Sequence, residues 1–199
     1  SEAFYWRTYM DSGEYGFGLF LSPLRPGTDC PRFARFLPAR LHDDEGEPMA
    51  IPNAICLFER NIGDAAWRHY EVFAQGPEAV PAEGRPGAEL VVRSASQVGN
   101  YDYFIDYVFQ LDGKIRIMIG STGIDAVKGV AAERTTKGST TADRLYGTLV
   151  AENLVAPNHD HFFNFRLDFD IDGTANRFMR TAIVPGEPEP DALRRSYWV

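Results

Sequence analysis

A tyrosine flanked by an amide and a carboxylate is the first candidate for chemistry in this sequence. Tyr101 lies between Asn100 and Asp102, just before a run that reads as a strand, Phe104–Leu111. A rigid strand would hold such a ring in place. The alternative is an ordinary packed ring, since tyrosine is common in strands.

Two histidines at alternate positions form a second candidate site. His159 and His161 flank Asp160, ahead of an aromatic run at residues 162–170 that reads as a strand. Alternate residues of a strand share a face, so both imidazoles would point the same way and Asp160 would point away. Two such imidazoles suit zinc, copper, iron or nickel. For this motif alone, the alternative is a pair of half-buried or surface histidines.

The elements that must position these residues are short β-rich runs separated by glycine and proline. Asp112-Gly113 joins two such runs, 104–111 and 114–119, and therefore predicts a β-hairpin. Residues 51–60 and 66–74 read as a further strand pair. Neither a sustained helical periodicity nor an internal repeat is present. The pattern predicts an all-β fold, and more narrowly a β-sandwich.

Charge and length limit the functional classes. The chain has 199 residues, with 20 basic against 28 acidic side chains and a net charge of −8. This charge disfavours nucleic acids and anionic membranes as partners, and mildly favours cationic ligands such as amines. No apolar run is long enough to cross a membrane. The length fits one domain or part of a larger one, 1–199, with surface loops expected at 76–88 and 128–144.

Taken together, the two candidate segments resemble the catalytic domain of the copper amine oxidases. In that family the tyrosine of an Asn-Tyr-Asp/Glu motif becomes the quinone cofactor topaquinone (TPQ), and a later His-x-His motif supplies two of three copper ligands. The order and spacing of Tyr101 and His159 fit this arrangement. The resemblance extends over nearly the whole chain and includes four further stretches, Tyr9–Gly18, Ile51–Arg60, Tyr146–Leu149 and Arg166–Gly173.

The resemblance implies a reaction and a role for each residue. Copper held by His159 and His161 would bring O₂ to Tyr101, which is converted to topaquinone. A primary amine would condense with the quinone, and Asp11 would be the general base that removes the α-proton. An aldehyde, ammonia and hydrogen peroxide would be released. Asp11 should be desolvated so that its pKa rises towards the working pH; the alternative is a turn residue before Ser12-Gly13.

Further residues match family positions with supporting roles. Tyr9 matches a position that gates access to the quinone, and Asn100 matches the residue that helps to orient it. Asp168, Asp170 and the backbone carbonyl of Phe169 match part of a calcium site found in some members, and such oxygen ligands suit that cation. The alternatives are an ordinary strand aromatic for Tyr9 and a solvated strand face for the two carboxylates.

The two cysteines, Cys30 and Cys56, are compatible on sequence alone with two buried thiols or with a disulfide. Many copper amine oxidases have a disulfide between the matching segments, so the resemblance predicts that Cys30 and Cys56 are bridged. Disulfides are rare in the cytosol, which favours a periplasmic or extracellular location.

One copper ligand has no match in this chain. The family's third histidine lies far downstream of His-x-His, and the two other histidines, His42 and His69, match no ligand position. The chain is then a subunit of a split oxidase, a fragment of a longer polypeptide, or a non-catalytic copper-binding or scaffolding relative. The first two together are the preferred interpretation. They predict a copper/topaquinone primary-amine oxidase that works within an oligomer or a longer polypeptide, which supplies the third histidine.

Overall fold

The structure, a computed structural model, describes residues 17–43, 45–70, 83–131, 147–171, 173–175, 177–180, 182–187, 189–190 and 197–198. The chain divides into two units, Ser1–Asn158 and His159–Val199. Within the described ranges, no helix is long and apolar enough to span a membrane.

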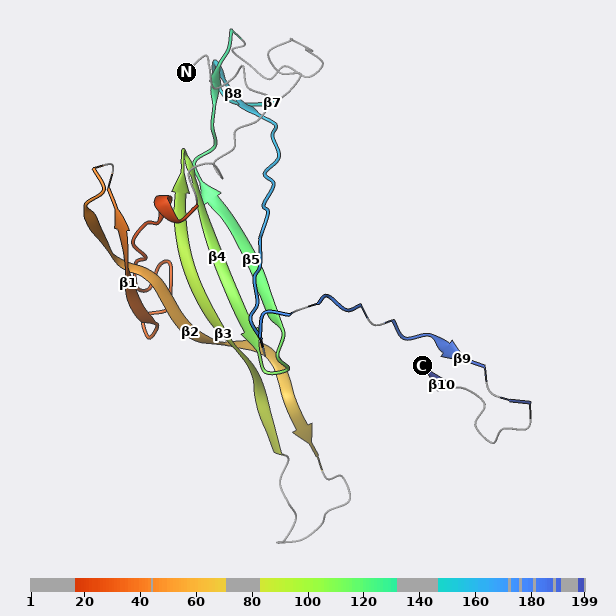
Figure 1. Cartoon of the computed structure of the whole chain (residues 1–199). Coiled ribbons are helices and arrows are strands. Elements are labelled where there is room, and N and C mark those ends of the chain that lie inside the picture. The colour runs from red at the N-terminus through yellow and green to blue at the C-terminus, as the bar shows by residue number, and fades with distance from the viewer. Residues whose placement is uncertain are drawn as a thin grey trace. The chain divides into compact units, whose positions relative to one another are not determined.

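The first unit is built on a five-stranded antiparallel sheet in the order β1-β2-β3-β4-β5 (Figure 1). Each strand pairs with the next one along the chain, so the sheet is a meander. A short 3-10 helix, η2 (Phe17–Phe20), contacts β3. The strands are β1 (Arg35–His42), β2 (Pro48–His69), β3 (Glu83–Val98), β4 (Tyr101–Gln110) and β5 (Ile115–Gly123).

Smaller sheets complete the described structure. The first unit also contains a three-stranded sheet in the order β6-β8-β7, made of β6 (Lys128–Gly129), β7 (Gly147–Ala151) and β8 (Leu154–Pro157). In the second unit, β9 (Pro185–Gly186) pairs antiparallel with β10 (Tyr197–Trp198). The described chain is therefore almost entirely strand and irregular structure, which confirms the predicted all-β fold.

The hairpin predicted at Asp112-Gly113 is confirmed. β4 and β5 pair antiparallel from Phe109↔Ile115 to Tyr101↔Gly123. Gly113 has φ +86°, a left-handed conformation that glycine adopts without steric cost. The turn sequence therefore sets the register of the two strands, and with it the partner of Tyr101.

The predicted pairing of strands 51–60 and 66–74 was wrong for the residues that the structure describes, and residues 71–74 lie outside them. Residues 48–69 form one continuous strand, β2, which pairs with β1 and β3 instead. The register with β3 shifts between Asn61 and Ala65, and Gly63 lies there with φ +82°. The glycine thus accommodates a bulge within a strand rather than a turn between two strands.

The surface loop expected at 76–88 is wrong at its C-terminal end, and residues 76–82 lie outside the described part of the chain. β3 begins at Glu83, so residues 83–88 belong to the sheet. Pro86 pairs with Ala65 at the irregular register of β2, where the proline's missing N–H is tolerated. In the second expected loop, 128–144, residues 128–129 form β6, and residues 132–144 lie outside the described part of the chain.

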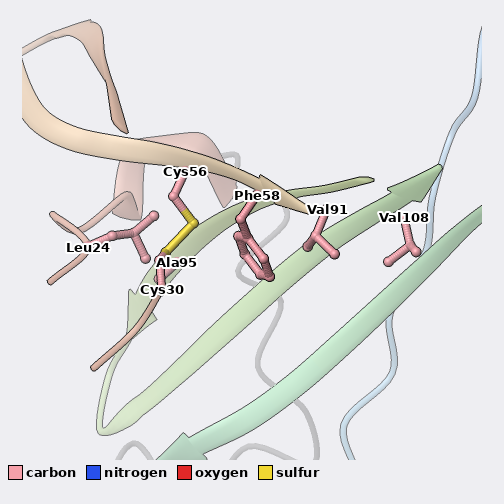
Figure 2. Close-up of a cluster of buried hydrophobic side chains, with 7 residues drawn as sticks. All are labelled: Leu24, Cys30, Cys56, Phe58, Val91, Ala95 and Val108. Atoms are coloured by element: carbon pink, nitrogen blue, oxygen red, sulfur yellow. A yellow bond between two sulfur atoms is a disulfide. The ribbon is translucent and has the colours of Figure 1, made fainter. Parts of the chain in front are cut away.

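One hydrophobic cluster lies against one face of the sheet and includes the predicted disulfide. Cys30, which precedes β1, is bonded to Cys56 of β2, so the bridge prediction is confirmed. In β3 the buried positions alternate, because Val91 is fully buried whereas its neighbour Leu90 is 45% exposed. Figure 2 shows the cluster, whose members are Leu24, Cys30, Cys56, Phe58, Val91, Ala95 and Val108.

Arg93 of β3 joins this cluster to the segment before β1. Its guanidinium donates two hydrogen bonds to the Asp106 carboxylate, Nε to Oδ1 at 2.7 Å and Nη2 to Oδ2 at 2.8 Å. Nη1 donates to the carbonyl of Asp29 at 2.6 Å. The rings of Phe58 and Phe104 lie 5.5 and 5.3 Å from the guanidinium carbon. The hydrogen bond to Asp106 raises the pKa of Arg93 further above its ordinary value, so the guanidinium stays charged.

Replacement of Arg93 by lysine should destabilise the fold although it keeps the charge. Lysine cannot form the two parallel bonds to Asp106 or the stacking contacts, so the Asp106 carboxylate, only 5% exposed, would lose its matched partner. We expect a loss of about 2–3 kcal/mol in the free energy of unfolding, measured by denaturant titration. Arg85→Lys, at an exposed position of the same strand, is the control and should change stability by less than about 0.5 kcal/mol. Equal stabilities for the two variants would contradict this role of Arg93.

A second charged group lies on the same face of the sheet. Glu89 of β3 is 4% exposed and accepts hydrogen bonds from Arg60 of β2, Gln110 of β4 and Arg116 of β5. The hydrogen bond from Arg60 contributes most to lowering the pKa of Glu89 below its ordinary value of 4.5, against the opposing effect of burial. This one carboxylate therefore links β3 to β2, β4 and β5.

The lowered pKa of Glu89 predicts a pH dependence of stability. Because the folded-state pKa lies below the unfolded-state value near 4.5, the ionised group stabilises the fold fully above that value. This contribution is lost as the pH falls through the folded-state pKa. Glu89→Gln should therefore be less stable than the parent at neutral pH, and the difference should shrink below pH 4.5.

Unfolding curves collected between neutral and acid pH would measure this change. Glu59→Gln, at an exposed carboxylate of β2, is the matched control and should leave the pH profile nearly parallel to that of the parent. A stability difference for Glu89→Gln that stays constant with pH would contradict the assigned titration.

Candidate functional site

Tyr101 is the first residue of β4, as the sequence predicted. It follows a two-residue turn, Gly99-Asn100, and pairs with Val98 of β3 on one side and Gly123 of β5 on the other. Gly99 has φ +63°, which the tight turn requires. β4 lies between β3 and β5 (Figure 1), so the backbone of Tyr101 is held between two strands.

Two tyrosines on the same face of β4 differ in burial. Tyr101 is partly exposed, whereas Tyr103 is only 6% exposed. The ring of Tyr103 lies 6.3 Å from that of Tyr101 and 5.6 Å from that of Phe17 in η2. Burial raises the pKa of Tyr103, and the neighbouring Tyr101 adds to this effect. Reagents in solution therefore have better access to Tyr101.

The segment after β5 contacts Tyr101 directly. The backbone N–H of Ala126 donates to the phenol oxygen of Tyr101 at 3.2 Å, and that of Ile124 donates to the carbonyl of Asn100 at 2.8 Å. Sequence reasoning missed this segment. A signal was present, because counting outward from the Asp112-Gly113 turn places Gly123 opposite Tyr101.

His159 and His161 lie close together in the second unit. Their ring centroids are 4.8 Å apart and the ring planes meet at 40°. Both residues are exposed. The prediction that the two imidazoles lie on one side of the chain is therefore consistent with the structure, and the pair fits two adjacent nitrogen ligands of a copper ion.

The predicted strand at 162–170 was wrong, because this segment is irregular in the structure. An alternating aromatic pattern forms a strand when its apolar side is buried against a sheet. Here Phe162 is 91% exposed and Leu167 is 54% exposed, so that burial does not occur. The spacing of the two histidines arises from an extended chain rather than from a sheet.

The described residues contain no group of three or more histidine, cysteine or acidic side chains placed to hold a metal ion. Asp168, Phe169 and Asp170 are exposed and irregular, and their calcium role stays a prediction. Asp11 and Tyr9 lie outside the described part of the chain.

Comparison with known proteins decides the family. A family model described as "Copper amine oxidase, enzyme domain" matches residues 1–199. The chain belongs to the copper amine oxidase family. The predicted membership of this family is therefore confirmed over the whole chain.

Curated copper amine oxidases match over nearly the whole chain. Primary amine oxidase 2 of Arabidopsis thaliana is 42% identical over 201 residues, which cover 100% of this chain and 29% of that protein. Primary amine oxidase of Klebsiella aerogenes is 45% identical over 185 residues, which cover 93% of this chain and 23% of that protein. The chain thus spans less than a third of the length of these relatives.

Solved structures of the family share the fold. The Pichia pastoris lysyl oxidase PPLO has a TM-score of 0.62 and 28% identity, covering 92% of this chain and 23% of its own. A copper-containing benzylamine oxidase of Hansenula polymorpha has a TM-score of 0.56 and 27% identity. The match covers 73% of this chain and 21% of that one. The fold is therefore part of the β-sandwich of the copper amine oxidase catalytic domain.

The adjacent imidazoles lead to a prediction for metal binding. If both imidazoles bind one copper ion as predicted, His159→Ala and His161→Ala should each weaken copper binding by about an order of magnitude or more, because either change removes one predicted nitrogen ligand. Equilibrium copper titration measures this effect. His42→Ala is the control, since this exposed histidine lies at the end of β1 and should leave the affinity unchanged. A larger loss in His42→Ala than in either of the other variants would reassign the ligand.

Proposed function

We propose that this chain forms part of a copper- and topaquinone-dependent primary-amine oxidase. The overall reaction converts a primary amine, O₂ and water to an aldehyde, ammonia and hydrogen peroxide. The observation that carries the proposal is a family match over all 199 residues that includes an accessible tyrosine within Asn100-Tyr101-Asp102, fixed at the start of β4.

Tyr101 is the proposed precursor of the quinone. Copper and O₂ supply the oxidation of the phenol, and the resulting quinone supplies the carbonyl and the electron acceptor for amine chemistry. The chain contributes a ring held at a strand end, partly open to solvent, beside a buried tyrosine that is less accessible to reagents. Asn100, in the adjoining turn, is proposed to orient the ring after oxidation.

His159 and His161 are proposed to provide two of the copper ligands. Their rings are near enough to bind one ion, and imidazole suits copper. A third imidazole is proposed to come from another chain or from the remainder of a longer polypeptide. A copper ion held by two imidazoles alone would keep much of its coordination to water, so a third ligand would tighten and orient the site.

Asp11 is proposed as the general base, and Tyr9 as the residue that controls access to the ring. The role of Asp11 is to take a proton from the α-carbon of the bound amine, which typically contributes a factor of about 10²–10⁴ to the rate. The Asp168–Asp170 segment is proposed as part of a calcium site, since its two carboxylates and a carbonyl are hard oxygen ligands. The disulfide supports maturation in an oxidising compartment, outside the cytoplasm.

A second candidate is a non-catalytic copper-binding or scaffolding subunit of the same family. It is favoured by one observation, that the described residues offer no three-ligand metal group. The two candidates differ in whether Tyr101 is ever oxidised, so the chemical state of that residue separates them.

The state of Tyr101 provides the main test. After exposure of the protein in its native assembly to Cu(II) and O₂, the peptide containing Tyr101 should gain about 30 Da, because two oxygens are added and two hydrogens are lost. Mass spectrometry and a redox-cycling quinone stain measure this change. Tyr101→Phe should bind copper but never give the stain.

Tyr103→Phe is the matched control for this experiment. It removes the neighbouring phenol on the same strand face, and the quinone should still form. An unmodified Tyr101 peptide after full copper loading would contradict oxidase activity and favour the scaffolding subunit.

A further inference from the structure

We propose that residues 123–126, the end of β5 and the irregular segment after it, are a backbone clamp that positions Tyr101 for its oxidation. The clamp is defined by Gly123, Ile124 and Ala126, which contact Tyr101 and Asn100. The inference rests on the proposed function, in which Tyr101 is the quinone precursor. No side-chain donor of the clamp takes part, so the positioning comes from main-chain groups and from the absence of a side chain at Gly123.

Gly123 allows β5 to approach the backbone of Tyr101 closely. A Cβ atom at this position would lie 2.4 Å from the carbonyl oxygen of Asn100 and 2.9 Å from the Cα of Tyr101. The residue also has φ +108°, a conformation that side chains disfavour. Any larger residue would therefore push away the strand end that holds the tyrosine, or distort β5.

The next two contacts fix the tyrosine at both of its ends. Ile124 N–H donates to the carbonyl of Asn100 at 2.8 Å, which holds the turn just before Tyr101. Ala126 N–H donates to the phenol oxygen at 3.2 Å. With the Cα held in the sheet and the phenol oxygen held by Ala126, the long axis of the ring is fixed and only rotation about that axis remains.

This arrangement matters because oxidation adds oxygen at ring carbons beside that axis. A ring whose axis is fixed keeps these carbons within a small region around the axis, whereas a free side chain would carry them to the positions of several rotamers. The clamp also contains no side chain that reacts with O₂ or copper, since its donors are backbone amides. It therefore orients the ring without competing for the oxidant.

Hydrogen exchange in the copper-free protein tests the contact with the phenol. Tyr101→Phe removes the acceptor of the Ala126 amide and leaves the acceptor of the Ile124 amide in place. The Ala126 amide should then exchange about threefold to tenfold faster, while the Ile124 amide changes little. Unchanged exchange at Ala126, or equal acceleration at both amides, would overturn the clamp. This measurement requires no quinone and no copper.

A pair of glycine variants tests the effect on oxidation. Gly123→Ala should slow quinone formation by about tenfold or more while copper affinity stays near that of the parent. Gly113→Ala is the matched control, because Gly113 has φ +86° in the same hairpin, at the opposite end from Tyr101, and a Cβ there meets no atom within 4 Å. It carries a similar backbone strain and should form the quinone at nearly the parental rate.

The outcomes distinguish the clamp from the proposed function. Equal slowing in Gly113→Ala and Gly123→Ala, or no slowing in Gly123→Ala, overturns the clamp while leaving the oxidase proposal intact. A parent protein that never forms quinone overturns the oxidase proposal, and the exchange result then still decides whether Ala126 holds the phenol.

Discussion

The bidentate salt bridge between Arg93 and Asp106 is the interaction on which the arrangement of the first unit depends. It crosses from β3 to β4, and the third guanidinium nitrogen reaches the carbonyl of Asp29, next to the disulfide. The rings of Phe58 and Phe104 contact the guanidinium and shield part of it from water. A charged group thus links the sheet, the segment before β1 and the hydrophobic cluster, where an apolar residue would leave Asp106 buried without a counter-ion.

The parts of this fold that follow from local chemistry could be predicted from sequence. Asp112-Gly113 forms its turn because glycine accepts the positive φ, and the turn then fixes which residue faces Tyr101. The disulfide was predicted from the family resemblance, since two cysteines in a sequence do not show whether they are free or bridged. The start of β4 at Tyr101 was also predictable, because the Gly99-Asn100 turn precedes it.

The errors arose where partners outside the segment decide its structure. A glycine such as Gly63 can end a strand or lie in a bulge, and only pairing with β3 makes it a bulge. Residues 162–170 have a strand-like pattern, but Phe162 stays exposed and the segment is irregular. The contacts around Tyr101 were missed for a related reason. Nearly every residue has a backbone N–H, so the residue type of Ala126 gives no sign that its amide is a donor to Tyr101.

The meander of the five-stranded sheet has a consequence for the order of events in maturation. Every strand pairs with its immediate successor along the chain, so the contacts that build the sheet are local and need little loop closure. Such topologies fold quickly compared with sheets made of distant strands. None of the pairings that surround Tyr101 involves a metal ligand. The backbone position of Tyr101 therefore depends on sheet pairings alone, and a metal-free chain can already hold this residue in place.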